Sequence, residues 1–141
     1  MLERHHIARD ISPLARVTRT TILGLAFLVR IIGLDVQGLW RDEVDQWRFA
    51  LQPWGEMLRN FTREGWNGPL YSPLLRVWIA LTGDSVFAMR YFSLLWGVLS
   101  VALLYVLVKR LIREDAAAWS ALLLSLSPYM VYYAQEIKMY T

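Results

Sequence analysis

The chain has 141 residues, no cysteine and a formal net charge of +3. This length excludes a large multidomain enzyme, and the lack of cysteine excludes a disulfide scaffold and a thiolate metal site. Both signs of charge are mixed along the chain, so no nucleic-acid partner is expected. Hydrophobic residues make up 56% of the sequence, above the roughly 45–50% of ordinary soluble domains, which favours a membrane protein if they lie in long runs.

A basic tail, residues 1–19, precedes the first apolar run. The tail holds four arginines, and no small-residue cleavage pattern follows, so it is not interpreted as a signal peptide. Residues 20–34 are apolar apart from Arg30, and we predict a first transmembrane helix over 20–39. Because a charge inside the membrane is costly, Arg30 should face protein or water, snorkel, or pair with an acidic residue. An interfacial helix is the alternative for this segment.

Residues 40–90 hold five of the seven tryptophans, a residue that concentrates at the membrane–water interface. Pro53 begins an amphipathic pattern of about eleven residues that should end near Gly65. This helix would lie on the membrane or pack against a partner protein. Residues 70–82 are apolar but too short for a full span, which suits a re-entrant or interfacial helix. Ser85, or the aspartate before it, is a candidate cap for the next helix.

Two long uncharged runs follow, over residues 91–108 and 116–135. Each is long enough to cross a bilayer core of about 30 Å as a helix. Buried helices of a soluble core are the alternative, but such helices usually carry a polar stripe, and neither run has one. The predicted fold is therefore an all-α polytopic membrane protein, with three transmembrane helices and interfacial amphipathic helices in the first outer loop.

The distribution of lysine and arginine predicts the orientation. Basic residues gather in the tail, 1–19, and in the connection 109–115, so both should be cytoplasmic. The loop 40–90 and the end of the chain, 136–141, should then face outward from an inner (cytoplasmic) membrane.

Two groups of charged residues are candidates for chemistry. Asp42 and Glu43 directly follow the first predicted span, where partial desolvation would suit a general base. A solvated acidic patch that includes Asp45 is the alternative. Glu136 and Lys138 follow the third span, and an aromatic belt with flanking charges is the alternative there. In the predicted topology both groups lie on the same face of the membrane.

The order of motifs resembles the N-terminal part of the GT-C membrane glycosyltransferases, and more narrowly the protein mannosyltransferase and aminoarabinose transferase branch. Those enzymes transfer a sugar from a polyprenyl-phosphate donor to an acceptor outside the cytoplasm. The motifs that carry the resemblance are Leu39-Trp40-Arg41-Asp42-Glu43, Asn67-Gly68-Pro69-Leu70-Tyr71, Gly83-Asp84-Ser85, Met89-Arg90 and Tyr132-Tyr133-Ala134-Gln135-Glu136.

The resemblance implies a role for each candidate residue. Asp42 corresponds to the catalytic base, with Glu43 as its partner, and Glu136 to an acidic residue that positions the acceptor or a metal. Lys138 stands where the family often has arginine and would bind the donor phosphate. The substrate-binding candidates are Asn67 and Tyr71. The implied donor is a polyprenyl-phosphate sugar, and a divalent metal is a possible cofactor, although no residue is assigned as a metal ligand.

The chain departs from the family in three respects. Asn67 begins a tripeptide where the family has His-Pro-Pro, and Arg41 stands where the family has an apolar residue. Family enzymes also continue through many more spans, which supply the enclosed donor pocket. We therefore expect an N-terminal fragment or short relative that is inactive alone. The alternative is a non-catalytic accessory subunit of a larger membrane complex. Membrane lipid and other membrane protein subunits are the expected partners.

Overall fold

A computed structural model describes residues 13–62 and 70–138. Within these ranges all regular secondary structure is α-helical, as predicted. The basic tail up to residue 12, Asn67 and the predicted helix end at Gly65 lie outside the described residues. The helices are α1 (Pro13–Ile31), α2 (Arg41–Leu51), α3 (Trp54–Asn60), α4 (Tyr71–Thr82), α5 (Val86–Leu111), α6 (Glu114–Leu126) and α7 (Pro128–Ala134).

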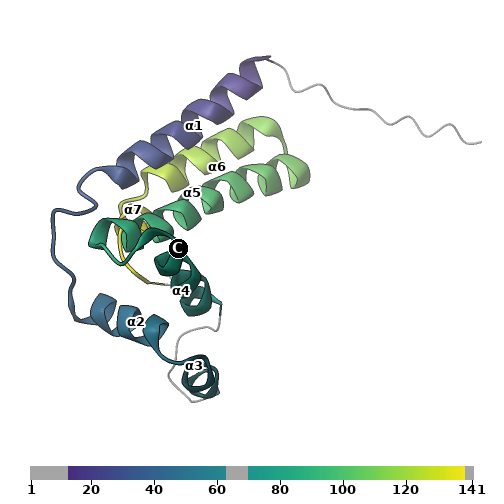
Figure 1. The fold of residues 1–141 in the computed structure, drawn as a ribbon. Coiled ribbons are helices and arrows are strands. Elements are labelled where there is room, and N and C mark those ends of the chain that lie inside the picture. The colour runs from purple at the N-terminus through teal and green to yellow at the C-terminus, as the bar shows by residue number, and fades with distance from the viewer. Residues whose placement is uncertain (1–12, 63–69, 139–141) are drawn as a thin grey trace, which may run out of the picture.

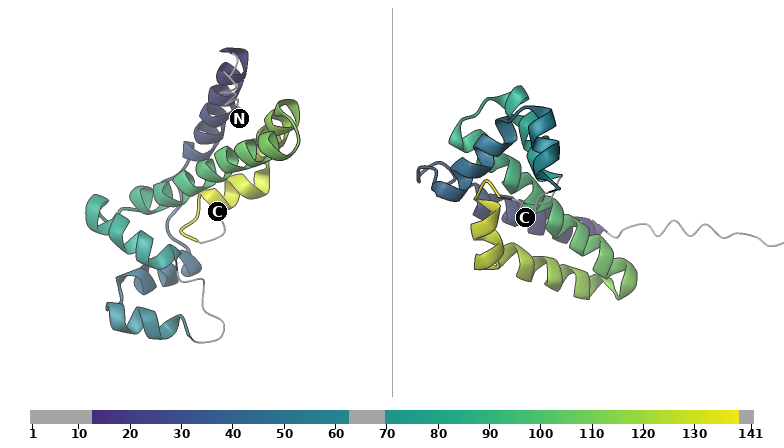
Figure 2. Two further views of the ribbon diagram at one scale, coloured as in Figure 1. Left: turned by 90° about the vertical axis from the view of Figure 1, so that its right-hand side faces the viewer. Right: turned by 90° about the horizontal axis from the view of Figure 1, so that it is seen from below.

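The helices form two groups that share α5 (Figures 1 and 2). In the first group, α1, α5 and α6 lie side by side as an elongated bundle, and α7 packs at one end of it. In the second group, α4 packs against α5 and α2 packs against α4. Because α5 belongs to both groups, the first turns of α5 lie where the two groups meet.

Half of the buried residues in the bundle core are alanines. Alanines allow helix backbones to approach closely, which is how helices associate where no water drives them together. The buried residues of this cluster come in pairs from α1, α5 and α6: Ile22 and Ala26, Val101 and Tyr105, Ala117 and Ala121.

A second core joins the remaining helices to the end of the chain. It contains Ala50 of α2, Leu75 of α4, and Met89 and Phe92 of α5. Ile137, which follows α7, is fully buried in the same cluster. The segment after α7 is therefore held against the helices of the 40–90 region.

Of the described helices, α5 alone is long and apolar enough to cross a membrane. Its 26 residues extend beyond the predicted span of 91–108 at both ends. The side chain of Ser85 accepts a hydrogen bond from the Ala88 amide at 3.2 Å, so the predicted cap is confirmed. The other two predicted spans differ from the helices observed, and the three-span topology stays a prediction.

The helix at the first predicted span begins earlier and ends earlier than 20–39. α1 ends at Ile31, and a turn with Gly33 at φ 77° follows. A positive φ is accessible to glycine without the steric cost that a side chain adds, so glycine commonly stops a helix in this way. Residues 34–39 consequently form a connection whose carbonyls are available to other partners.

The structure divides the third predicted span, 116–135, into two helices. Pro128 has no backbone N–H and takes the first position of α7, so α6 ends at Leu126. The 13 residues of α6 rise only about 20 Å, which is shorter than a bilayer core.

Arg30 is fully buried between α1 and α6, and the prediction that it faces protein is confirmed. Its guanidinium donates to the carbonyls of Ala26 and Ser125, both at 3.0 Å, and of Leu124 at 3.3 Å. Its partners are therefore backbone carbonyls rather than an acidic side chain.

The described part of the 40–90 region contains α2, α3, α4 and the first turn of α5. The predicted amphipathic helix begins after Pro53 but is only the 7-residue α3. α2 precedes it, with Asp42 and Glu43 in its first turn, where acidic side chains favour the helix N-terminus. α4 matches the predicted helix over 70–82 and ends at Gly83, where φ is 85°.

Candidate active site

A buried ion pair between α2 and α5 lies at the centre of the site. Glu43 is fully buried and Arg90 is 6% exposed. The Arg90 Nη2 lies 2.7 Å from Glu43 Oε2, and its Nε lies 2.9 Å from Oε1. This two-pronged contact is the strongest geometry available to arginine and a carboxylate.

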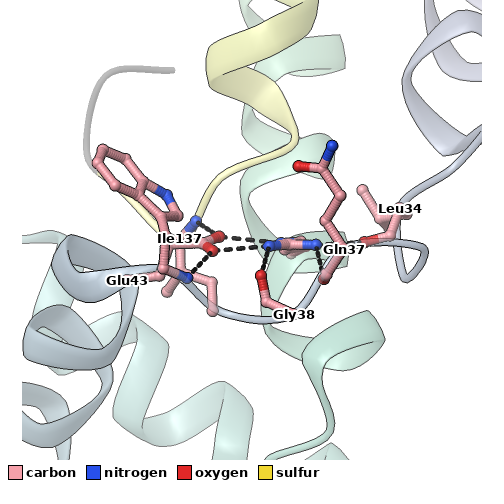
Figure 3. Close-up of polar contacts among 7 residues, drawn as sticks. Leu34, Gln37, Gly38, Glu43 and Ile137 are labelled. Carbon is pink, nitrogen blue, oxygen red and sulfur yellow. Dashed lines mark hydrogen bonds and ion pairs between the residues drawn. The ribbon is translucent and has the colours of Figure 1, made fainter.

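The same guanidinium holds the connection after α1. Arg90 donates to the carbonyls of Leu34 at 3.0 Å, Gln37 at 2.8 Å and Gly38 at 3.3 Å (Figure 3). With the two bonds to Glu43, its five hydrogen bonds use every N–H that a guanidinium offers. Burial of the charge is compensated because each donor has a partner.

Glu43 in turn holds two backbone amides. Its Oε1 accepts the N–H of Ile137 at 3.0 Å, and its Oε2 accepts the N–H of Trp40 at 3.3 Å. One carboxylate therefore links the start of α2, the first turns of α5 and the segment after α7 (Figure 3).

Next to the Glu43–Arg90 ion pair lies a second ion pair that is more exposed to solvent. Lys138 Nζ is 3.7 Å from Asp42 Oδ2. The Asp42 side chain is 49% exposed, whereas that of Lys138 is 10% exposed. Of the two adjacent carboxylates, Asp42 is thus the one that solvent or a ligand can reach.

Glu136 is 6% exposed, and its Oε2 is a buried oxygen without a hydrogen-bond partner in the described chain. It lines a pocket of about 570 Å³ together with Trp40, Tyr132, Gln135, Arg90 and residues of the connection after α1. A buried acceptor without a partner is uncommon in folded proteins, so this oxygen is available to a water molecule or a ligand in the pocket.

Residues 67–139, just over half of the chain, match the dolichyl-phosphate-mannose-protein mannosyltransferase family. The chain belongs to this family. The membership confirms the resemblance on which the expected activity rests. Searches among curated proteins and among solved structures found no match. The matched region includes α4, α5, α6 and α7, whereas Asp42 and Glu43 precede it.

The structure of this mannosyltransferase-family chain brings four of the predicted site residues together. Asp42 and Glu43 begin α2, and Glu136 and Lys138 follow α7. The bond from Glu43 to the Ile137 amide joins these two segments across 94 positions of the sequence.

Of the other two predicted residues, the structure describes Tyr71. Tyr71 lies on α4, where its hydroxyl is 2.7 Å from Ser93 Oγ and its ring packs 5.4 Å from that of Phe92. Burial raises the pKa of the Tyr71 hydroxyl, so this group stays protonated. Asn67 lies outside the described residues.

Arg90 is the residue that sequence reasoning left without a role. The sequence does indicate that Arg90 needs a partner, because an unpaired arginine in the first turns of a long apolar helix is costly. The sequence did not indicate which of the six acidic residues in the 40–90 region that partner is.

Among the described residues there is no group of three or more histidine, aspartate or glutamate side chains that could hold a metal ion. The two carboxylates at the start of α2 already face cations, Lys138 and Arg90. The chemistry proposed below therefore assigns no step to a metal.

Proposed function

We propose that this membrane protein takes part in the transfer of a sugar from a polyprenyl-phosphate donor to an acceptor hydroxyl, with Asp42 as the general base. The observation that carries the proposal is that Asp42, an accessible carboxylate, is paired with Lys138. This pair lies beside the buried Glu43–Arg90 ion pair. Family membership supports the class of donor.

The reaction needs little covalent work from the protein. The acceptor oxygen attacks C1 of the donor sugar, a new C1–O bond forms, and the bond from C1 to the phosphate oxygen breaks. Polyprenyl phosphate leaves with the bonding electrons, and Asp42 takes the proton of the acceptor hydroxyl. Orientation of the acceptor and removal of its proton are the contributions expected of the enzyme.

Lys138 and Glu136 have different roles in this proposal. The ammonium group of Lys138, next to Asp42, would attract the donor phosphate as a point charge. The unpartnered Oε2 of Glu136 would accept a hydrogen bond from a hydroxyl in the adjoining pocket. Glu136 is therefore proposed to orient the acceptor rather than to take its proton.

The proposal also includes a topology. α5 would cross the membrane, and α1 and the pair α6–α7 would form the other two membrane elements. Burial of Arg30 inside the bundle keeps its charge away from lipid, which supports a membrane position for α1. With basic ends inside, the Asp42 site would lie on the outer face of an inner membrane.

Transfer can be measured in membranes that contain the chain, with polyprenyl-phosphate mannose as the labelled donor. Asp42→Asn should abolish the transfer that the wild-type chain supports, because the amide cannot accept the proton. Asp45→Asn is the matched control, since Asp45 is an exposed aspartate on the same helix, and it should leave transfer unchanged.

Two outcomes would contradict the proposal. Equal transfer by wild type and Asp42→Asn would remove Asp42 from the chemistry. Absence of transfer from any polyprenyl-phosphate sugar, combined with loss of a larger membrane complex when the chain is deleted, would favour an accessory subunit instead.

A further inference from the structure

We infer that Arg90 is a positioning residue for sugar transfer: through Glu43 it holds Asp42 and Lys138 opposite each other. The inference rests on the proposed function for its activity readout. Arg90 is 6% exposed and is connected to Asp42 and Lys138 through Glu43, although it also lines the pocket that Glu136 lines.

Asp42 and Lys138 are each next in sequence to a residue that the Glu43 carboxylate fixes. Asp42 directly precedes Glu43 in the first turn of α2. Lys138 directly follows Ile137, whose N–H donates to Glu43 Oε1 at 3.0 Å. The 3.7 Å approach of Lys138 to Asp42 is therefore set by where the Glu43 carboxylate lies.

The position of the Glu43 carboxylate depends on Arg90. The carboxylate is fully buried, and among the described residues Arg90 is the basic side chain within ion-pair distance of it. Removing one member of a buried pair leaves the other charge uncompensated, so the survivor would move towards solvent or lose its charge. Movement of the carboxylate would release the Ile137 amide, and loss of its charge would weaken the hydrogen bond to that amide.

The contacts of Arg90 require an arginine rather than a lysine. The planar guanidinium reaches two carboxylate oxygens and three carbonyls at once. A lysine would keep the positive charge but offers a single nitrogen with three N–H groups, which cannot span that set. Arg90→Lys therefore separates the geometric role of the side chain from its charge.

Cross-linking tests the positioning without any activity assay. The chain contains no native cysteine, so an Asp42→Cys, Lys138→Cys pair can be joined by a short thiol-specific bifunctional reagent. We expect this pair to cross-link readily when Arg90 is present and at least about tenfold more slowly with Arg90→Lys. A Lys109→Cys, Glu114→Cys pair replaces an ion pair at the other end of α5. Its rate should not change, which also shows that the variant folds.

The activity readout uses chains with Asp42 and Lys138 intact. Arg90→Lys should lower kcat by about 10- to 100-fold, the order of loss caused by a small misplacement of reacting groups. It should leave the KM for the donor nearly unchanged. Arg110→Lys is the matched control, because Arg110 is an exposed arginine at the far end of the same helix.

The outcomes separate this inference from the proposed function. An unchanged cross-linking rate in Arg90→Lys would overturn the positioning role. A slower rate with unaltered kcat would show that the placement does not matter for transfer, and would also overturn it. If cross-linking responds as expected but the wild-type chain transfers no sugar, the proposed function fails and the structural link through Arg90 stands.

Discussion

Arg30 supplies the hydrogen bond that Pro128 cannot make. In a continuous helix the carbonyl of Leu124 would accept the backbone N–H of residue 128, but proline has none. The Arg30 Nη2 donates to this carbonyl at 3.3 Å, and its Nη1 donates to the next one, of Ser125, at 3.0 Å. A side chain of α1 therefore completes the C-terminal end of α6, where a positive charge also favours the helix dipole.

Loss of this contact should destabilise the bundle. Arg30→Met keeps a side chain of similar length but removes the guanidinium, so the Leu124 and Ser125 carbonyls lose this partner. We expect the free energy of unfolding in detergent to fall by about 1–3 kcal/mol or more, the cost of a buried unpaired polar group. Arg110→Met, at an exposed arginine of α5, is the control and should have little effect.

The relationship also predicts a rescue. Pro128→Ala restores a backbone N–H at residue 128, so the carbonyl of Leu124 regains a partner within the chain. The double variant Arg30→Met, Pro128→Ala should then be less destabilised than the sum of the two single variants. Strict additivity of the three unfolding free energies would argue that Arg30 and Pro128 act independently.

A close approach between α5 and α7 depends on Gly97. A Cβ atom at this position would lie 2.8 Å from Ala134 Cβ and 3.3 Å from Arg30 Nε. Gly97→Ala should therefore push the helices apart and cost about 1–3 kcal/mol, measured by unfolding in detergent. Gly24→Ala on α1 meets nothing within 4 Å and should be neutral or stabilising, because alanine is the better helix former.

The Arg90–Glu43 and Lys109–Glu114 ion pairs should differ widely in their contributions to stability. Glu43→Gln leaves the Arg90 charge buried and unpaired, and we expect a loss of about 3–5 kcal/mol. Glu114→Gln breaks the pair with Lys109, whose side chains are 32% and 41% exposed, and should have a small effect that salt reduces further. Equal losses in the two variants would contradict this assignment.

Glu136 should show opposite effects on stability and activity. Glu136→Gln removes a buried charge whose Oε2 has no partner in the described structure, so the free energy of unfolding should stay the same or rise. Transfer should nevertheless fall, with a higher KM for the acceptor, because the amide is a weaker acceptor than the carboxylate. An unchanged acceptor KM would remove Glu136 from acceptor binding.

Local patterns predicted much of the helical structure. The uninterrupted apolar run indicated α5, Ser85 was a candidate for its cap, and Gly83 stands at the end of α4. The same reasoning read residues 116–135 as one helix, because the apolar composition of the run outweighed Pro128. The helix α2 was not predicted, because the charged residues at its start were interpreted only as a candidate site.

For the candidate site, residue types and order indicated that Asp42, Glu43, Glu136 and Lys138 belong together, along with the family. Tertiary structure decided what each one contacts there and how exposed it is. Glu43 and Arg90 are 47 positions apart, and Glu43 and Ile137 are 94 apart, so no helical period or local spacing relates them. Burial of Glu43 against Arg90 leaves Asp42 as the accessible carboxylate. That distinction between two adjacent acidic residues arises only when α2, α5 and the segment after α7 pack together.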